Sequence, residues 1–408
     1  MPRLACPFCY HRIDGAMLWY QCMGKGSADR DGCLPIDDAA RRRETGFAEP
    51  MLPTFPPPRG QRWRPTSKAY CPDCDGGTGM RACPCCHTPL PANFGESRGP
   101  LIAMVGAKGT GKTVYMTVLA RELRSPGLRR RFDADIRLTG DGQGGFRSPL
   151  QWLENNVDRM FVGHQLFPAT TQAIKGRQEP LVFEWRAERR SWLRDRRMLH
   201  TRPVYNTSYL SFYDTAGEDL SRQAQAYDLE YIGAADALIL LLDPFMLPKA
   251  RERLNLPDSA ITSTEATIDV LSRVTESLRA YLGVPGHRRI RKPLAVAFAK
   301  MDAFFEELGE GHPLRREPGQ VPAYDDALGR DTHEHVRALL RGWQGDDIDT
   351  HLRFNYETFR YFFVSALGAP PDYDNAMVDD GGVRPYRVNE PLLWLLSRFG
   401  VVPRQARR

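Results

Sequence analysis

The segment that constrains this chain most is GAKGTGKT at Gly106–Thr113, which directly follows the apolar run PLIAMV at residues 100–105. It matches the pattern GxxxxGK(S/T) in full. Glycines in such a loop let the backbone curl so that successive amides point at phosphate oxygens, and the helix that follows adds the positive end of its dipole. The apolar run before the loop and the helical pattern after Lys112 therefore predict a strand, a phosphate-binding loop and a helix in succession.

Within this loop, we expect Lys112 to reach the β- and γ-phosphates and Thr113 to coordinate Mg²⁺. The alternative is a chance match in a chain that contains 35 glycines. The strand and the helix expected on either side favour phosphate binding over chance. The residues expected to contact the nucleotide here are Gly106, Lys108, Gly109, Thr110, Gly111, Lys112, Thr113 and Val114.

From about residue 100 onward, apolar runs alternate with longer helical patterns, which is typical of an α/β fold with a mainly parallel sheet. Six core strands are expected, at 100–105, 180–187, 207–213, 236–242, 293–299 and 359–364. Helices are expected after Lys112 and near 149–162, 218–232, 264–282, 331–343 and 389–399. Ser263 and Thr264 are the start signal of the helix near 264, and Gly283 is its stop signal. The pattern predicts a six-stranded, mostly parallel sheet flanked by helices.

Three further motifs follow expected strands in a fixed order. YLSFYDTAGED places Asp214 at the end of the third strand, where it would hold Mg²⁺ through water, while the amide of Gly217 would sense a γ-phosphate. The DxxG pattern alone is common, but here it ends an aromatic and β-branched run downstream of the glycine-rich loop. The other two motifs, AFAKMD at 297–302 and FVSALG at 363–368, also lie at strand ends.

This ordered set resembles the translation-factor/Ras-like class of P-loop GTPases over about residues 100–400. That class reads (N/T)KxD at the third of these four motifs and SA followed by K or L at the last. The resemblance implies a Ras-like domain over 98–402 in which Asp302 pairs with the edge of guanine and Lys300 lies along the base. It also implies that the loop of Ser365, Ala366 and Leu367 contacts the base from the other side.

Two positions depart from that family pattern. Ala299 stands where the family usually has Asn or Thr, so one contact beside the base or within its loop is missing. GTP is still expected, because the preference for guanine depends mainly on the carboxylate. Glu218 stands where Ras-like proteins place the Gln that orients the attacking water. A carboxylate accepts a hydrogen bond from water but cannot donate as an amide does, so slow unaided hydrolysis is predicted.

The first switch should lie just before the second strand, where LFPATTQ offers Thr171 as the Mg²⁺-sensing threonine and Thr170 as its nearest rival. An ordinary polar loop is the alternative interpretation. The two switches are expected at 165–172 and 214–225. Insertions near 125–168, which contains the glycine-rich TGDGQGGF, and near 244–262 lengthen the domain. Together with the cysteine-rich N-terminus, they resemble bacterial double-GTPase proteins of predicted conflict systems.

All nine cysteines lie between Cys6 and Cys86. The N-terminus shows no apolar core of a signal peptide, so a cytoplasmic protein is expected, and in a reducing compartment CxxC pairs indicate metal rather than disulfides. The pattern CxxC-x8-CxxC predicts one zinc site at Cys71, Cys74, Cys83 and Cys86. The remaining set predicted as a second zinc site is Cys6, Cys9, Cys22 and Cys33.

Four thiolates close a tetrahedral site, so both zinc sites should be structural. The alternatives left open are unligated thiols, an iron–sulfur cluster, and the use of Cys85 or His87 in place of Cys86. The predicted organisation is a zinc-ribbon-like module at 1–49, a Pro-rich linker at 50–69 and a zinc-knuckle module at 70–95, followed by the nucleotide-binding domain.

The net charge of +6 arises partly from basic clusters, which more often form a solvated face or a partner surface than a nucleic-acid site. No run approaches the roughly 20 apolar residues that span a bilayer. The sequence therefore predicts a GTP-binding switch that hydrolyses GTP slowly with Mg²⁺ and signals to protein partners, an effector or a GTPase activator. The alternatives are a P-loop ATPase and a zinc-dependent adaptor that binds nucleotide without meaningful turnover.

Overall fold

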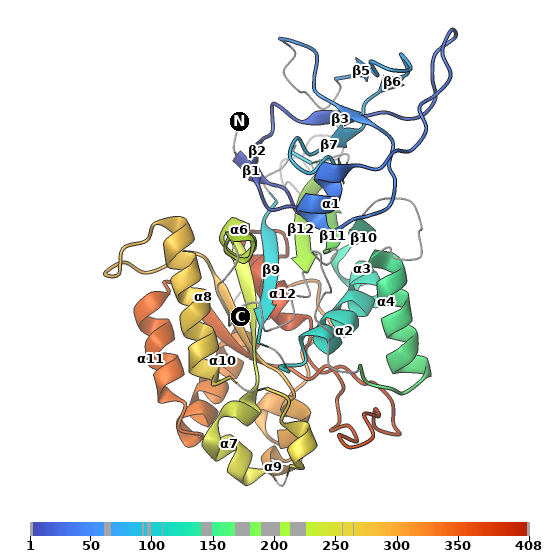
Figure 1. Ribbon diagram of the computed structural model, residues 1–408. Helices are drawn as coiled ribbons and strands as arrows, with labels where there is room; N and C mark the ends of the chain where they lie inside the picture. The colour runs from blue at the N-terminus through green and yellow to red at the C-terminus, as the bar shows by residue number, and fades with distance from the viewer. Residues whose placement is uncertain are drawn as a thin grey trace, which may run out of the picture. The chain divides into compact units, whose positions relative to one another are not determined.

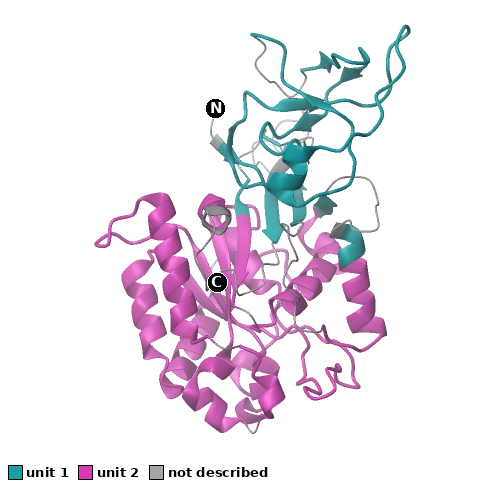
Figure 2. Ribbon diagram, in the orientation of Figure 1, with its two compact units in different colours: residues 1–101, 135–152, 173–213 teal, residues 102–134, 153–172, 214–408 magenta. Residues whose placement is uncertain are grey.

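The structure is a computed structural model, and it describes residues 3–60, 67–91, 94–95, 99–107, 109–139, 149–167, 180–188, 205–212, 226–254, 256–263 and 265–405. Figure 2 shows that the chain divides into two compact units. Unit 1 comprises Met1–Leu101, Asp135–Trp152 and Ala173–Tyr213. Unit 2 comprises Ile102–Ala134, Leu153–Gln172 and Asp214–Arg408.

Unit 2 is built on four strands of the large sheet, β9 (Leu101–Gly106), β13 (Ala237–Leu242), β14 (Leu294–Phe298) and β15 (Phe359–Phe363), which lie in that order. All three neighbouring pairs are parallel. The runs LIAMVG, ALILLL and LAVAF are buried at every position, as strands covered on both faces require. Because parallel strands share a direction, the residues that follow these strands meet at one edge of the sheet.

Helices surround this sheet (Figure 1). In chain order they are α2 (Lys112–Arg124), α3 (Pro126–Phe132), α4 (Pro149–Val157), α6 (Ala226–Ala234), α7 (Pro248–Arg253), α8 (Thr267–Leu282), α9 (Phe305–Leu308), α10 (Asp326–Gly342), α11 (Asp346–Asn355) and α12 (Glu390–Arg398). A π-helical turn at Asp158–Val162 and 3-10 turns at Pro244–Met246, Asp258–Ala260, Met301–Phe304 and Pro313–Arg315 are the other helical elements among the described residues after residue 100. α12 packs on β13 and β14, α10 packs on β15, and α8 contacts both α6 and α11.

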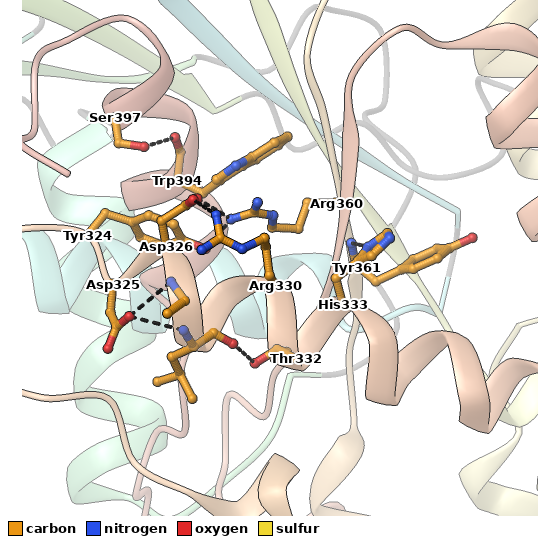
Figure 3. A network of polar contacts seen from close by, with 12 residues as sticks. Tyr324, Asp325, Asp326, Arg330, Thr332, His333, Arg360, Tyr361, Trp394 and Ser397 are labelled. Carbon is orange, nitrogen blue, oxygen red and sulfur yellow. Dashed lines mark hydrogen bonds and ion pairs between the residues drawn. The ribbon is translucent and has the colours of Figure 1, made fainter. Parts of the chain in front are cut away.

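A polar network ties β15 to its helices (Figure 3). Arg360 of β15 donates to the Tyr324 hydroxyl at 3.2 Å and to Asp326 Oδ1 at 2.9 Å, at the start of α10. Its guanidinium also lies 5.4 Å from the centre of the Trp394 ring on α12. The Tyr361 amide, on this edge strand, donates to His333 Nδ1 at 3.1 Å. His333 thus satisfies a backbone amide of the edge strand that could otherwise pair with a strand of another molecule.

Unit 1 contributes three further strands to the large sheet, β10 (Ala134–Thr139), β11 (Leu181–Glu188) and β12 (Tyr205–Phe212). β11 and β12 are antiparallel over their full length, from Leu181 opposite Phe212 to Glu188 opposite Tyr205. The prediction of six strands is wrong, because the large sheet of the described residues has seven. The sheet is mixed, with parallel β9–β13, β13–β14 and β14–β15 pairs and an antiparallel β11–β12 pair. β10, with its sequence ADIRLT, lies in a stretch that was expected to be an insertion.

The N-terminal part of unit 1 consists of short strands and one helix. A two-stranded sheet pairs β1 (Arg3–Ala5) with β2 (Arg12–Asp14), and another pairs β5 (Ala69–Tyr70) with β6 (Gly77–Thr78). A four-stranded sheet has the order β4 (Thr54–Phe55), β3 (Trp19–Gln21), β7 (Arg81–Ala82) and β8 (Pro89–Leu90). α1 (Ala39–Thr45) begins at the N-cap Asp38 and ends at Gly46. Although these strands have only two or three residues each, side chains from them and from the intervening loops pack together, among them Tyr20, Phe55 and Ala69.

Candidate functional site

The glycine-rich loop lies between β9 and α2 in unit 2. β9 ends at Gly106 and α2 begins at Lys112, as the sequence predicts. Gly109 and Gly111 adopt φ values of 79° and 80°, which side chains rarely tolerate. Gly111 is the N-cap of α2, so the positive end of the helix dipole lies at the loop. The two glycines give the loop the curl that phosphate binding requires.

Contacts to the rest of unit 2 fix the shape of this loop. The Thr262 hydroxyl donates to the Gly109 carbonyl at 2.8 Å, and the Thr110 hydroxyl donates to the Ala107 carbonyl at 2.9 Å. A Cβ atom on Gly109 would lie 2.5 Å from the carbonyl carbon of Thr262. Lys112 is buried at the start of α2. The loop is therefore closely packed on the segment that contains Thr262.

The third and fourth motifs meet at the carboxyl ends of β14 and β15. Asp302 is only 4% exposed, and its Oδ1 accepts a hydrogen bond from the Ser365 hydroxyl at 2.5 Å. The Ser365 oxygen in turn accepts from the Gly368 amide at 2.7 Å. Burial raises the pKa of Asp302, and the hydrogen bond from Ser365 opposes that rise. The two sequence motifs that were expected to share a ligand are thus in direct contact.

Backbone hydrogen bonds brace both of these loops. The Ala299 amide donates to the Leu242 carbonyl at 3.0 Å, which continues the ladder between β13 and β14. The Leu367 carbonyl accepts from the Arg384 amide at 2.8 Å. Ala366 lies half-buried in the same turn. A backbone hydrogen bond therefore braces the loop at Ala299, the position where the Ras-like class usually has Asn or Thr.

Lys300, in the loop after β14, extends toward the glycine loop. Its backbone has φ 55°, directly after β14, and its Cε lies 4.0 Å from the position that a Cβ on Gly111 would occupy. Its ammonium group donates to Asp243 Oδ2 at 2.6 Å. Asp243 was not predicted as a site residue. It is the first polar residue after the apolar run of β13, just as Asp214 and Asp302 lie near the ends of other apolar runs. Its position at a strand end could therefore have identified it.

Several predicted site residues lie outside the part of the chain that the structure describes. They are Lys108, Thr170, Thr171, Asp214, Gly217 and Glu218. TGDGQGGF after its first residue, the helix start at Thr264 and most of both predicted switches also lie outside it. Their roles in Mg²⁺ binding, γ-phosphate sensing and water orientation stay predictions.

Three CxxC pairs of unit 1 occupy the tips of three similar hairpins. Cys6 and Cys9 lie between β1 and β2, Cys71 and Cys74 between β5 and β6, and Cys83 and Cys86 between β7 and β8. In each hairpin the amide of the first cysteine donates to the carbonyl five residues later, and the amide four residues later donates back to the first cysteine. The three residues at that fourth position have positive φ values, and they are Tyr10, Asp75 and His87.

Eight cysteines converge in two groups of four whose sulfur atoms lie within 4.8 Å of one another in each group. The Sγ–Sγ distances of Cys6–Cys86 and Cys9–Cys83 are both 3.8 Å, and those of Cys22–Cys74 and Cys33–Cys71 are 3.5 and 3.8 Å. A tetrahedron with Zn–S bonds of about 2.3 Å has an edge of about 3.8 Å. All nine cysteines are free, so each group has the donors and the spacing for one zinc ion.

The predicted grouping of these cysteines is wrong. Cys6 and Cys9 join Cys83 and Cys86, whereas Cys22 and Cys33 join Cys71 and Cys74. β6 and β7 belong to different small sheets, so the adjacent CxxC pairs point into different clusters. β3 pairs with β7, which brings the first and last parts of the cysteine-rich segment together. Each group therefore draws on both of the predicted zinc modules.

Cys85 lies outside both groups, and Cys86 rather than a neighbour is the fourth member of its group. His87 has a different task, since its Nδ1 lies 2.7 Å from Asp38 Oδ2 and its ring stacks on Trp19 at 4.7 Å. Nearby, the Tyr10 hydroxyl lies 2.9 Å from the Ser211 hydroxyl. The hairpin of Cys6 and Cys9 is thus anchored on β12, the strand that leads toward the predicted DTAG motif.

No family model matches this chain. Over 345 residues it is 28% identical to the protein described as "Putative ESX-1 scaffolding and assembly protein SaeC" from Mycolicibacterium smegmatis, with coverage of 79% of this chain and 81% of that protein. The resemblance to double-GTPase proteins of conflict systems stays a prediction.

Two solved structures are similar to parts of this chain. The first is described as "Signal recognition particle receptor SRb-GTP/SRX complex from Chaetomium thermophilum" (16% identity, 67% of this chain, 94% of that chain, TM-score 0.28). The second is the GTPase-like domain of S. cerevisiae Ski7 bound to GTP (13% identity, 74% of this chain, 50% of that chain, TM-score 0.30). Both TM-scores are too low to carry an argument, so the assignment depends on the geometry of the site.

Among the residues that the structure describes, every helix is too short or too polar to cross a membrane. The described part of unit 2 offers a curled glycine loop, the buried carboxylate of Asp302 in contact with Ser365, and a lysine, Lys300, whose side chain approaches the glycine loop. The described part of unit 1 offers two four-thiolate clusters.

Proposed function

We propose that this protein is a GTP-binding switch with a Ras-like P-loop domain over 98–402 and an N-terminal part stabilised by two zinc ions. The observation that carries the proposal is the contact between Asp302 and Ser365, with Lys300 extending from the same loop to Gly111. A base held by Asp302 would thus have its phosphates beside the glycine loop. Four motifs in family order support the same interpretation.

In this proposal the amides of the glycine loop and Lys112 bind the phosphates, and Thr113 coordinates Mg²⁺ together with Thr171 and Asp214. The metal would neutralise charge that develops on the phosphates. Gly217 senses the γ-phosphate, so GTP orders both switches and GDP releases them. Glu218 makes unaided hydrolysis slow, and a protein partner that supplies an arginine would accelerate it.

The test of this proposal is a change in base preference. Asp302→Asn replaces an acceptor of two hydrogen bonds with an amide that donates to the 2-oxo group of xanthine. We expect the variant to lose GTP affinity by at least about tenfold, the loss of one good hydrogen bond to a charged group, and to gain affinity for xanthosine triphosphate. Fluorescence titrations of both nucleotides would measure this, and unchanged GTP affinity would exclude Asp302 from base recognition.

A second candidate function is a nucleotide-binding scaffold with no meaningful turnover. The similarity to a protein described as a scaffolding and assembly protein favours it, and so does Glu218 in place of glutamine. The two candidates differ in turnover. Phosphate release from GTP that stays at background with purified wild type, and is also unchanged in a Glu218→Gln variant, would favour the scaffold.

A further inference from the structure

Asp243 is a buried carboxylate that none of the four nucleotide motifs uses. It directly follows β13, its side chain is 2% exposed, and it accepts from Lys300 Nζ at 2.6 Å and from the Phe245 amide at 2.9 Å. A buried carboxylate without a partner would be costly, so the lysine and the carboxylate fix each other's positions. Lys300 itself remains partly exposed at 18%. The pair therefore holds a flexible lysine side chain at the edge of the site.

The contacts continue from Lys300 to the glycine loop. Its Nζ lies 3.4 Å from the Thr262 hydroxyl oxygen, and that hydroxyl donates to the Gly109 carbonyl at 2.8 Å. Asp243 and Thr110 also line the same small cavity behind the loop. The connected groups come from the end of β13, the loop after β14, the segment before α8 and the glycine loop. A route of hydrogen bonds thus joins the base-recognition lysine to the backbone of the phosphate loop.

We propose that Asp243 and Thr262 are positioning residues for nucleotide binding: Asp243 holds Lys300 in place, and Thr262 transmits that placement to the glycine loop. This inference rests on the proposed function. A lysine and a loop that are ordered before the ligand arrives lose less conformational freedom on binding, which increases affinity. The predicted insertion that contains Thr262 thereby acquires a role in the nucleotide site.

A double-mutant cycle tests the first half of this proposal. GDP affinity is measured by calorimetry for the full chain, Asp243→Asn, Lys300→Ala and the double variant. We expect Asp243→Asn alone to weaken GDP by about tenfold or more, and in the Lys300→Ala background by less than about threefold, because coupled residues are not additive. An equal fold-loss in both backgrounds would show that Asp243 does not act through Lys300 and would overturn the proposal.

Thr262 offers a variant with little risk to folding. Thr262→Val keeps the shape of the side chain and removes the hydroxyl, whereas Thr262→Ser keeps the hydroxyl and is the matched control. We expect about three- to tenfold weaker GDP binding for valine and a change below about twofold for serine, the range of one neutral hydrogen bond. The melting temperature of the ligand-free protein should be the same for both. Equal affinities of the two variants would remove Thr262 from the positioning role.

A failure of the positioning role can be distinguished from a failure of the proposed function. Titrations of the wild type with GDP and ADP show which nucleotide binds, and the cycle is then run with that nucleotide. A preference for ADP would refute guanine recognition and leave the positioning test intact. Strong guanine preference with an additive cycle would refute the positioning role and leave the proposed function intact.

Discussion

Paired cysteine substitutions test the grouping of the zinc ligands, because the structural and the sequence-based groupings predict opposite results. In the structure Cys6 shares a group with Cys83, whereas Cys33 belongs to the other group. Cys6→Ser with Cys83→Ser therefore damages one site, and Cys6→Ser with Cys33→Ser damages both. The sequence-based grouping reverses the two expectations. Cys85→Ser is the matched control, since Cys85 lies in neither group.

The expected zinc content follows from the two sets of cysteine ligands. Two groups of four thiols at tetrahedral spacing should bind about two zinc ions per chain. Structural zinc contributes about 10–16 kcal/mol of apparent binding free energy, which is comparable with the whole stability of a domain. A site that loses even one of its four thiolates should lose its zinc on purification, and the hairpins around it should unfold locally.

Zinc content per purified chain, measured by mass spectrometry of the metal, is the assay. We expect about two zinc ions in wild type and Cys85→Ser, about one in the Cys6 and Cys83 double variant, and about none in the Cys6 and Cys33 double variant. None in the first double variant and one in the second would restore the sequence-based grouping. A wild type without zinc would refute both.

Three further predictions concern the nucleotide site. Lys112→Ala should abolish tight nucleotide binding and leave the zinc content unchanged, as titration and metal analysis of one sample would show, because the zinc clusters lie in unit 1. Gly109→Ala should cost about 1–2 kcal/mol for its left-handed backbone, in addition to the clash with Thr262, and thermal unfolding together with GTP titration would measure both effects. Burial raises the pKa of Asp302, so its carboxyl is protonated at a higher pH than an ordinary aspartate; GTP affinity should fall as the pH drops through that raised pKa, and Asp302→Asn should show no such fall.

The parallel part of the fold could be predicted from sequence because its signals are local. Buried apolar runs identify β9, β13 and β14, and the stop at Gly283 is confirmed, since Gly283 ends α8 with φ 61°. The start of α8 was predicted wrongly. α8 begins at Thr267, and its N-cap Ala266 makes no side-chain hydrogen bond. Ser263 is buried, four residues before the first residue of the helix, so it does not cap it.

Features that depend on distant pairings were beyond the sequence. β10 was missed because its polar side chains resemble those of a loop, and Arg186 of β11 pairs with Asp135 at 2.9 Å to hold them. The spacing of cysteines identifies hairpin tips but not which tips face each other. α11 was missed because its residues continue the polar pattern after α10. Asp243 could not be assigned a role until Lys300 was placed beside it.

The central claim is that the site binds guanine nucleotides, and calorimetric titration of the wild type with GTP and with ATP, both with Mg²⁺, tests it most directly. Guanine offers Asp302 two donors, whereas adenine would leave this buried carboxylate without them, at a cost of about 1–3 kcal/mol. The account therefore predicts that GTP binds at least about tenfold to a hundredfold more tightly than ATP. Equal affinities, or tighter binding of ATP, would contradict it and favour a P-loop ATPase.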